Sequence, residues 1–330
     1  MKARIYFIIF YVISFIWSCA IKAEINKNNK SYDDFIQAVW VFESSIDPTK
    51  QAYYNANWNN PVISSYPLVT SPGNVIRDSY TGEPLQQYNL TVKEYFSTLG
   101  VAHIYDPEKP MQNWGEIQAS VINYLGFVGF QFQESDLQTL GYYNFQTETV
   151  KGITYPKHYV DVPVSHWRYG VKEYLETDPK IVSEPTIVTD TVNYIDMNFT
   201  GKNGVSSLKD FMDPSKQIFI IKDHFNNKYT GIVKGLSKHG KNINDYLGIT
   251  ITWDGLTPMV SPPPGGRSNN VIITMSGLLA GAHLRGAEGI VSMLIDGKNP
   301  EDENGTYILQ YVQDYAGYDT PFDFIRKISQ

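Results

Sequence analysis

One carboxyl group stands out for its position in the chain. Glu43 follows the apolar run 40–42 and precedes two serines, at the point where the hydrophobic pattern stops. Apolar neighbours disfavour a carboxylate, and the partial negative charge at the C-terminal end of a helix acts in the same direction. Glu43 is therefore a candidate general acid, although a solvated glutamate at a helix end is the commoner case.

Other reactive residue types lack the arrangement that their chemistry needs. His224, His239 and His283 are scattered along the chain without metal-ligand spacing, and Ser276 lacks the strand-turn-helix context of a hydrolase nucleophile. The glycine-containing stretches match neither a phosphate loop nor a dinucleotide fingerprint. We therefore predict no metal and no cofactor, and interpret His283 first as a satisfied core histidine.

The N-terminal segment 1–23 combines a basic start with an apolar run and ends among small residues, which is typical of a secretory signal peptide. Its cleavage would remove Cys19, the sole cysteine, so the mature chain could form no internal disulfide. In a second interpretation Cys19 is the acylated first residue of a bacterial lipoprotein, and in a third the segment stays as a membrane anchor.

Composition narrows the class of partner. The formal net charge is −7, and loss of the basic leader would make the chain more acidic still, so we predict no nucleic-acid partner. The 330 residues suffice for a substantial core. The 24 Tyr, 16 Phe and 6 Trp suit stacking on sugars, but they are equally ordinary core material.

Periodicity and capping signals predict a mainly helical chain. Ser31 is a candidate N-cap of a helix that ends at Glu43. Further helices are expected over residues 92–99, 134–140, 206–236, 274–284 and 305–315. Gly141 would close the helix predicted over 134–140. Gly277 and Gly281 lie on one face of the helix predicted over 274–284 and would allow close helix packing.

Two stretches interrupt this pattern. Residues from about 48 to 113 are rich in Asn, Tyr, Pro and Ser, and residues 150–198 alternate around prolines, which favours short strands or extended loops. We interpret both as insertions in a single domain over residues 24–330. The predicted fold class is mainly α (α+β), a helical domain with irregular or β-containing insertions.

Several segments in order resemble the lysozyme-like superfamily, in particular soluble lytic transglycosylases, goose-type lysozymes and related bacterial and phage proteins. The resemblance lies in Glu43-Ser44-Ser45, Leu125 to Phe132, Gly141-Tyr142-Tyr143, Phe199 to Leu208, Ser276 to Leu284 with the following 285–289, and Asn304-Gly305-Thr306. It covers about half of the mature chain. His283 and Leu284 stand where the wider family has Tyr-Asn.

The resemblance implies roles for six residues. Glu43 would be the catalytic acid, Ser45 and Gln131 would position the substrate, and three others would shape the cleft: Phe130, Tyr142 and His283. A peptidoglycan glycan strand is the implied substrate, and a secreted or periplasmic bacterial protein the implied setting.

The number of carboxyl groups bears on the mechanism. Most glycosidases use two, and the candidates for a second are Asp47, Glu134, Asp213 and Asp223, none in a distinctive context. The resemblance implies that one glutamate suffices in a lytic transglycosylase, which we favour slightly over muramidase hydrolysis. The alternatives are a non-catalytic peptidoglycan-binding or wall-assembly protein, and a toxin delivered into competing bacteria.

Overall fold

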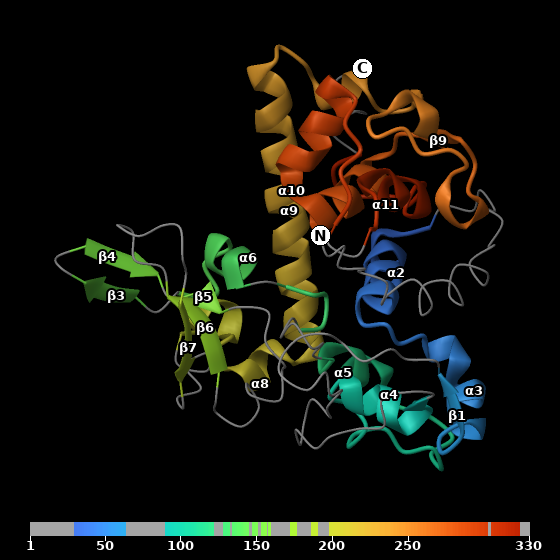
Figure 1. The fold of residues 1–330 in the computed structure, drawn as a ribbon, viewed down its shortest axis with the longest axis vertical. Helices are drawn as coiled ribbons and strands as arrows, with labels where there is room; N and C mark the ends of the chain where they lie inside the picture. Colours follow the sequence, from blue (N-terminus) through green and yellow to red (C-terminus); the bar gives the residue numbers. More distant parts are fainter. Residues whose placement is uncertain are drawn as a thin grey trace, which may run out of the picture. The chain divides into compact units, whose positions relative to one another are not determined.

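The computed structural model describes residues 30–63, 90–121, 128–132, 134–144, 147–150, 153–156, 158–159, 172–176, 186–190, 198–302 and 305–323. The predicted leader with Cys19 lies outside these residues, as does much of both predicted insertions. The described residues form helices and small antiparallel sheets, which confirms the mainly α (α+β) class (Figure 1). A lysozyme-like arrangement of these elements stays a prediction.

The chain divides into two compact units. The first contains residues up to Val39 together with Lys222 onward, and the second runs from Trp40 to Ile221. The division falls within two helices, α2 (Tyr32–Glu43) and α9 (Pro214–Lys238). The interpretation of residues 24–330 as one domain stays a prediction.

Helix α2 begins and ends where the sequence predicted. The Ser31 hydroxyl accepts a hydrogen bond from the Asp34 amide at 3.2 Å, and the Asp34 carboxylate accepts one from the Ser31 amide at 2.8 Å. These bonds satisfy amides that a helix start leaves without partners. Phe35 packs on Phe225 of α9 with ring centroids 4.9 Å apart, and both are buried.

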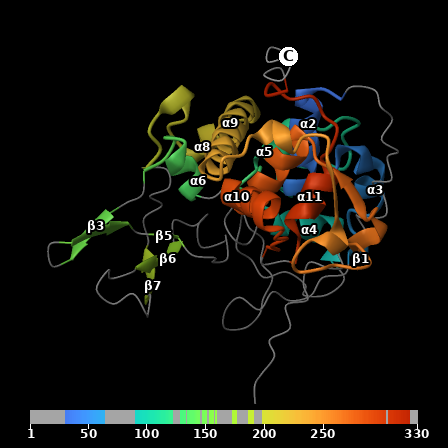
Figure 2. The same cartoon turned by 90° about the horizontal axis from the view of Figure 1, so that it is seen from above.

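The first unit is built on α9, α10 (Met275–Asp296) and α11 (Ile308–Asp314). It also contains the hairpin of β8 (Thr250–Thr252) and β9 (Asn270–Ile272), and the 3₁₀ turns η3 (Ile243–Asp245), η4 (Trp253–Gly255) and η5 (Pro264–Gly266). Both ribbon views show α10 beside α11 (Figures 1 and 2).

Glycine allows the helices of the first unit to approach closely. A Cβ atom at Gly277 would lie 2.4 Å from the carbonyl oxygen of Val312 in α11, and one at Gly231 would lie 2.8 Å from the Ala287 side chain. The predicted close packing through Gly277 is thereby confirmed. The helix predicted over 274–284 ends at a break, because Arg285 (φ −125°) and Gly286 (φ 72°) leave helical geometry. A second helical segment, which the sequence did not predict, then continues α10 to Asp296.

The second unit holds shorter elements. Its helices are α3 (Gln51–Ala56), α4 (Val92–Thr98), α5 (Trp114–Ala119), α6 (Glu134–Thr139) and α8 (Leu208–Phe211), with η1 (Pro48–Lys50) and η2 (Lys202–Gly204). Its strands are β1 (Pro61–Ile63), β2 (Leu90–Thr91), β3 (Thr147–Val150), β4 (Ile153–Pro156), β5 (His158–Tyr159), β6 (Lys172–Glu176) and β7 (Thr186–Asp190). They pair as β1-β2, β3-β4 and β5-β6-β7, all antiparallel.

Local signals explain several of these boundaries. Thr91 and Glu94 form a reciprocal capping box at the start of α4, the helix predicted over 92–99. After α6, the Gly141 amide donates to the Gln138 carbonyl and the Tyr142 amide to the Leu137 carbonyl, with Gly141 at φ 76°. This left-handed glycine closes the helix as predicted.

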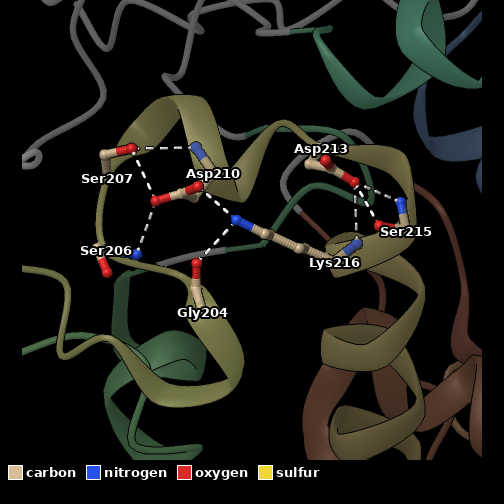
Figure 3. A network of polar contacts seen from close by, with 7 residues as sticks. All are labelled: Gly204, Ser206, Ser207, Asp210, Asp213, Ser215 and Lys216. Atoms are coloured by element: carbon tan, nitrogen blue, oxygen red, sulfur yellow. Dashed lines mark hydrogen bonds and ion pairs between the residues drawn. The ribbon is translucent and has the colours of Figure 1, made fainter.

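The predicted helix over 206–236 is in fact two helices, α8 and α9. Asp213 interrupts the helix because its carboxylate turns back to cap α9: it accepts hydrogen bonds from the Ser215 amide at 2.8 Å and the Lys216 amide at 3.3 Å (Figure 3). Pro214 then occupies the first helical position, where no amide proton is needed. Hydrogen bonds to the carboxylate, above all from the Ser215 hydroxyl, lower the pKa of Asp213.

The start of α9 is further fixed by Lys216. Its ammonium group donates to the Gly204 carbonyl at 2.8 Å and to the Asp210 carboxylate (Figure 3). Asp210 in turn accepts from the Ser206 amide at 3.0 Å and the Ser207 hydroxyl at 3.1 Å. The contact with Lys216, followed by that with Ser206, lowers the pKa of Asp210. The loop before α8, α8 itself and the first turn of α9 are thus tied together.

Candidate active site

The segment 43–47, here named the acid turn, begins at the last residue of α2. The Ser44 amide donates to the Trp40 carbonyl at 2.9 Å, and the Ser45 amide to the Phe42 carbonyl at 3.0 Å. Glu43 and Ser45 are partly exposed, which leaves them accessible to a ligand. Trp40 is 4% exposed but Phe42 is 36% exposed, so only one of the two expected aromatic neighbours lies in the core.

Side chains from two other helices hold the acid turn. The Tyr95 hydroxyl of α4 donates to the Ser45 carbonyl at 3.1 Å, and the Gln118 amide of α5 donates to the Ile46 carbonyl at 3.0 Å. Burial raises the pKa of the Tyr95 hydroxyl, so it stays a neutral donor throughout the physiological range. These bonds fix backbone carbonyls directly after Glu43. Ser45 itself has a positive φ of 57°, a strained conformation for a non-glycine residue.

The segment 128–132, here named the glutamine turn, carries the second group of predicted residues. Val128 and Phe132 pair in an antiparallel bridge, and the Gln131 amide donates to the Val128 carbonyl at 3.0 Å. Both Gly129 (φ 57°) and Gln131 (φ 60°) adopt the left-handed conformation. Gln131 is partly exposed as a residue but its side-chain Nε2 atom is buried, and Phe130 is fully buried.

The structure brings the acid turn and the glutamine turn onto one buried support. The rings of Trp40 and Phe130 stack with centroids 4.9 Å apart and planes 18° apart. The Gly129 amide donates to the Val121 carbonyl at 2.9 Å, just beyond α5, the helix whose Gln118 holds the acid turn. The end of α5 therefore contacts both turns. Sequence reasoning missed Gln118, which has no distinctive context in the chain.

Two of the predicted cleft residues lie beneath the surface. Phe130 and Tyr142 are each 0% exposed, so neither side chain can touch a ligand in this structure. The Tyr142 hydroxyl accepts a hydrogen bond from the Asn203 amide at 2.8 Å, and the Lys202 ammonium lies 4.3 Å from its ring centroid. Both aromatic residues can shape a binding surface only by supporting it from below.

Among the four candidates for a second catalytic carboxyl group, Asp47 and Asp213 form hydrogen bonds that cap helices. Asp47 accepts hydrogen bonds from the Thr49 amide at 2.9 Å and the Thr49 hydroxyl at 2.6 Å, which makes it a cap of η1. Asp213 caps α9. Glu134 begins α6, and Asp223 belongs to the first unit. Only Asp47 shares the acid turn with Glu43.

His283 belongs to the first unit and pairs with a histidine that sequence reasoning did not connect to it. Its Nδ1 lies 3.1 Å from Nε2 of His224, and the ring centroids are 5.1 Å apart. His224 is 1% exposed. Burial, followed by the nearby His283 and Lys228, holds its pKa well below the usual value of 6.5. The contact gives His283 the hydrogen-bond partner expected of a satisfied core histidine, but His283 itself is partly exposed and only its partner His224 lies in the core.

Metal ligands do not cluster within the described part of the chain: no group of three or more His, Cys, Asp or Glu side chains there could hold an ion. One described helix, α10, is long and apolar enough to cross a membrane by length and composition alone. Its Gly277 and Gly281 face α11 instead. No family model, curated protein or solved structure matches the chain.

Proposed function

We propose that the protein cleaves bacterial peptidoglycan at the glycosidic bond between MurNAc and GlcNAc, with Glu43 as the catalytic residue. One observation carries the proposal: the acid turn and the glutamine turn share a buried support, through the Trp40 and Phe130 stack and the end of α5. A site that holds reacting groups in place must stand on such fixed elements. The proposal also draws on the resemblance of these segments to lytic transglycosylases.

A single carboxyl group fits a transglycosylase reaction better than hydrolysis. Glu43 protonates the glycosidic oxygen as its bond to the sugar carbon breaks. The carboxylate then accepts the proton of the substrate's own hydroxyl while that oxygen bonds to the same carbon. The product is an anhydro sugar, no water is consumed, and Glu43 regains its proton. Asp47, the other carboxyl group of the acid turn, already accepts two hydrogen bonds at its Oδ1 as a cap of η1.

One partly exposed residue on each turn would bind the sugar, Gln131 with its side-chain Nε2 buried. Ser45 follows Glu43 on the acid turn, and Gln131 lies on the glutamine turn. Their left-handed backbones are the kind of strained conformation that clusters at functional sites. Phe130 and Tyr142 would support these turns from below, and the role implied for His283 stays a prediction. Such a protein acts outside the cytoplasm, in agreement with the predicted leader.

The test compares the purified protein with its Glu43→Gln variant on cell-wall sacculi. The wild type should release muropeptides and the variant should release none. Glu108→Gln serves as the matched control, because Glu108 is an exposed loop residue of the same unit. Equal release by wild type and Glu43→Gln would overturn the assignment.

Mass spectrometry of the released fragments decides the reaction. Anhydro sugar ends support the transglycosylase mechanism, and reducing ends would replace it by hydrolysis. If the wild type sediments with sacculi but releases nothing, the protein is a non-catalytic wall-binding protein and the proposal of cleavage fails.

A further inference from the structure

Gln217 is a buried glutamine of the second unit and is far in the sequence from every predicted site residue. Gln217 is 0% exposed, and its Nε2 donates a hydrogen bond of 2.8 Å to the carbonyl oxygen of Ala119, the last residue of α5. The two residues are separated by 98 positions in the chain. A buried amide with such a long-range partner is conspicuous, because burial of a polar group costs free energy unless it is hydrogen-bonded.

The same amide lies against the glutamine turn. A Cβ atom built at Gly129 would lie 2.0 Å from Oε1 of Gln217 and 2.6 Å from its Nε2. The Gln217 amide therefore fills the space that a side chain at position 129 would need. The left-handed φ of 57° at Gly129 adds a second reason for glycine at this position.

We propose that Gln217 is a positioning residue that sets the glutamine turn against the end of α5, and through it against the acid turn. Two consecutive residues of α5 make the connection: the Ala119 carbonyl accepts from Gln217, and the Gln118 side chain donates to the Ile46 carbonyl of the acid turn. A change at Gln217 therefore displaces Gln131 relative to Glu43.

The position of Gln217 is itself fixed at the start of α9. Its backbone amide donates to the Asp213 carbonyl at 2.9 Å, and the side chain of Asp213 caps the helix. The neighbouring Lys216 is tied to the Gly204 carbonyl and to Asp210 (Figure 3). The Gln217 side chain thus extends from the first turn of α9, which is fixed by these bonds, and can therefore fix the position of the glutamine turn.

The role of Gln217 in turnover rests on the proposed function. The experiment therefore measures kcat and also a fluorine NMR signal, which does not depend on enzyme activity. Trp40 stacks on Phe130 of the glutamine turn, so a fluorine label on its indole ring reports displacement of that turn. The protein is labelled with 5-fluorotryptophan, and the Trp40 resonance is assigned with Trp40→Phe. Gln217→Met keeps the length of the side chain and removes the hydrogen-bond donor.

Gln217→Met should shift the Trp40 resonance and lower kcat by roughly 10- to 100-fold, because misplacement on the order of an ångström has such effects. Asn299→Ala is the matched control: it removes a buried amide that accepts from the Leu309 backbone in the first unit, and should leave both readouts unchanged. Gln217→Glu, measured at acidic pH where its carboxyl carries a proton, restores a donor and should restore both readouts. It also serves as the test if Gln217→Met does not fold.

A wild-type Trp40 resonance in folded Gln217→Met would overturn the proposal, whether or not kcat falls. If the wild type releases no muropeptides, the proposed function fails, and the resonance alone then decides whether Gln217 positions the turn.

Discussion

Trp40 and Phe130 stack in the core of the second unit, with ring centroids 4.9 Å apart. Trp40 lies on the last turns of the helix that ends at Glu43, and Phe130 precedes Gln131. The stack thus joins the backbone segments that carry the candidate acid and the candidate sugar-binding amide. Such ring pairs add stabilisation beyond the burial of their area.

Phe130→Ala should destabilise the protein by about 3–5 kcal/mol, because it leaves a cavity under Trp40 at a fully buried position. Chemical denaturation measures the change. The control is Phe219→Ala: Phe219 is 60% exposed, so its truncation should stay within about 0.5 kcal/mol of the wild type. Similar losses in the two variants would contradict the buried stack.

The His224 and His283 pair predicts loss of stability in mild acid. Burial lowers the pKa of His224 in the folded state. Near pH 6.5 the His224 side chain therefore takes up a proton in the unfolded chain but stays neutral in the folded protein. The stabilisation of the folded state by neutral His224 is complete above pH 6.5. As the pH drops below 6.5, this stabilisation decreases by at most about 1.4 kcal/mol per pH unit. Thermal unfolding between pH 7.5 and 5 should show this loss.

His224→Gln removes the titrating group and should flatten the pH dependence in that window. His239→Gln, at an exposed residue beyond α9, is the control and should leave the wild-type curve unchanged. Carboxylates whose pKa is lowered, such as Asp213, lose their contribution only at lower pH, near and below 3.8. If His224→Gln and wild type lose equal stability above pH 5, the histidine pair is not the cause.

Gly277→Ala should destabilise the first unit by about 1–3 kcal/mol, because overpacking forces backbone shifts. The new Cβ would lie 2.4 Å from the Val312 carbonyl oxygen, a backbone atom that cannot move aside cheaply. Gly115→Ala is the comparison, since its Cβ would meet only ordinary contact at 3.5 Å from Pro214. Calorimetry should rank Gly277→Ala well below Gly115→Ala in melting temperature; equal values would refute the close packing of α10 and α11.

Asp213→Ala should cost about 1 kcal/mol, the usual effect of losing a helix cap. The Asp213 carboxylate accepts hydrogen bonds from the Ser215 and Lys216 amides, and the alanine variant leaves both amides without this acceptor. Asp33→Ala is the control, because the Asp33 side chain is 83% exposed in its ion pair with Lys222 and such pairs contribute little. Urea denaturation that finds the same midpoint for Asp213→Ala as for wild type would contradict the capping role.

Local patterns predicted individual elements well. The Ser31 cap, the apolar spacing of α2 and the left-handed Gly141 depend on neighbours within a few residues, so they can be recognised in the sequence. The same reasoning missed the break at Asp213, because an apolar period continues from α8 into α9 although the Asp213 carboxylate caps the start of a new helix. It placed a helix end at Leu284, where the backbone does leave helical geometry, but it did not predict the helical segment that follows to Asp296.

Local sequence patterns were enough to predict that Glu43 ends a helix, that the fold is mainly helical, and that Gly277 lies on a closely packed face. What supports Glu43 depends on contacts between distant segments and could not be predicted in this way. Gln118 reaches Ile46 across 72 positions, and Gln217 reaches Ala119 across 98. A glutamine in a helix carries no local sign of its partner, because its hydrogen bond forms only when distant segments pack and exclude water.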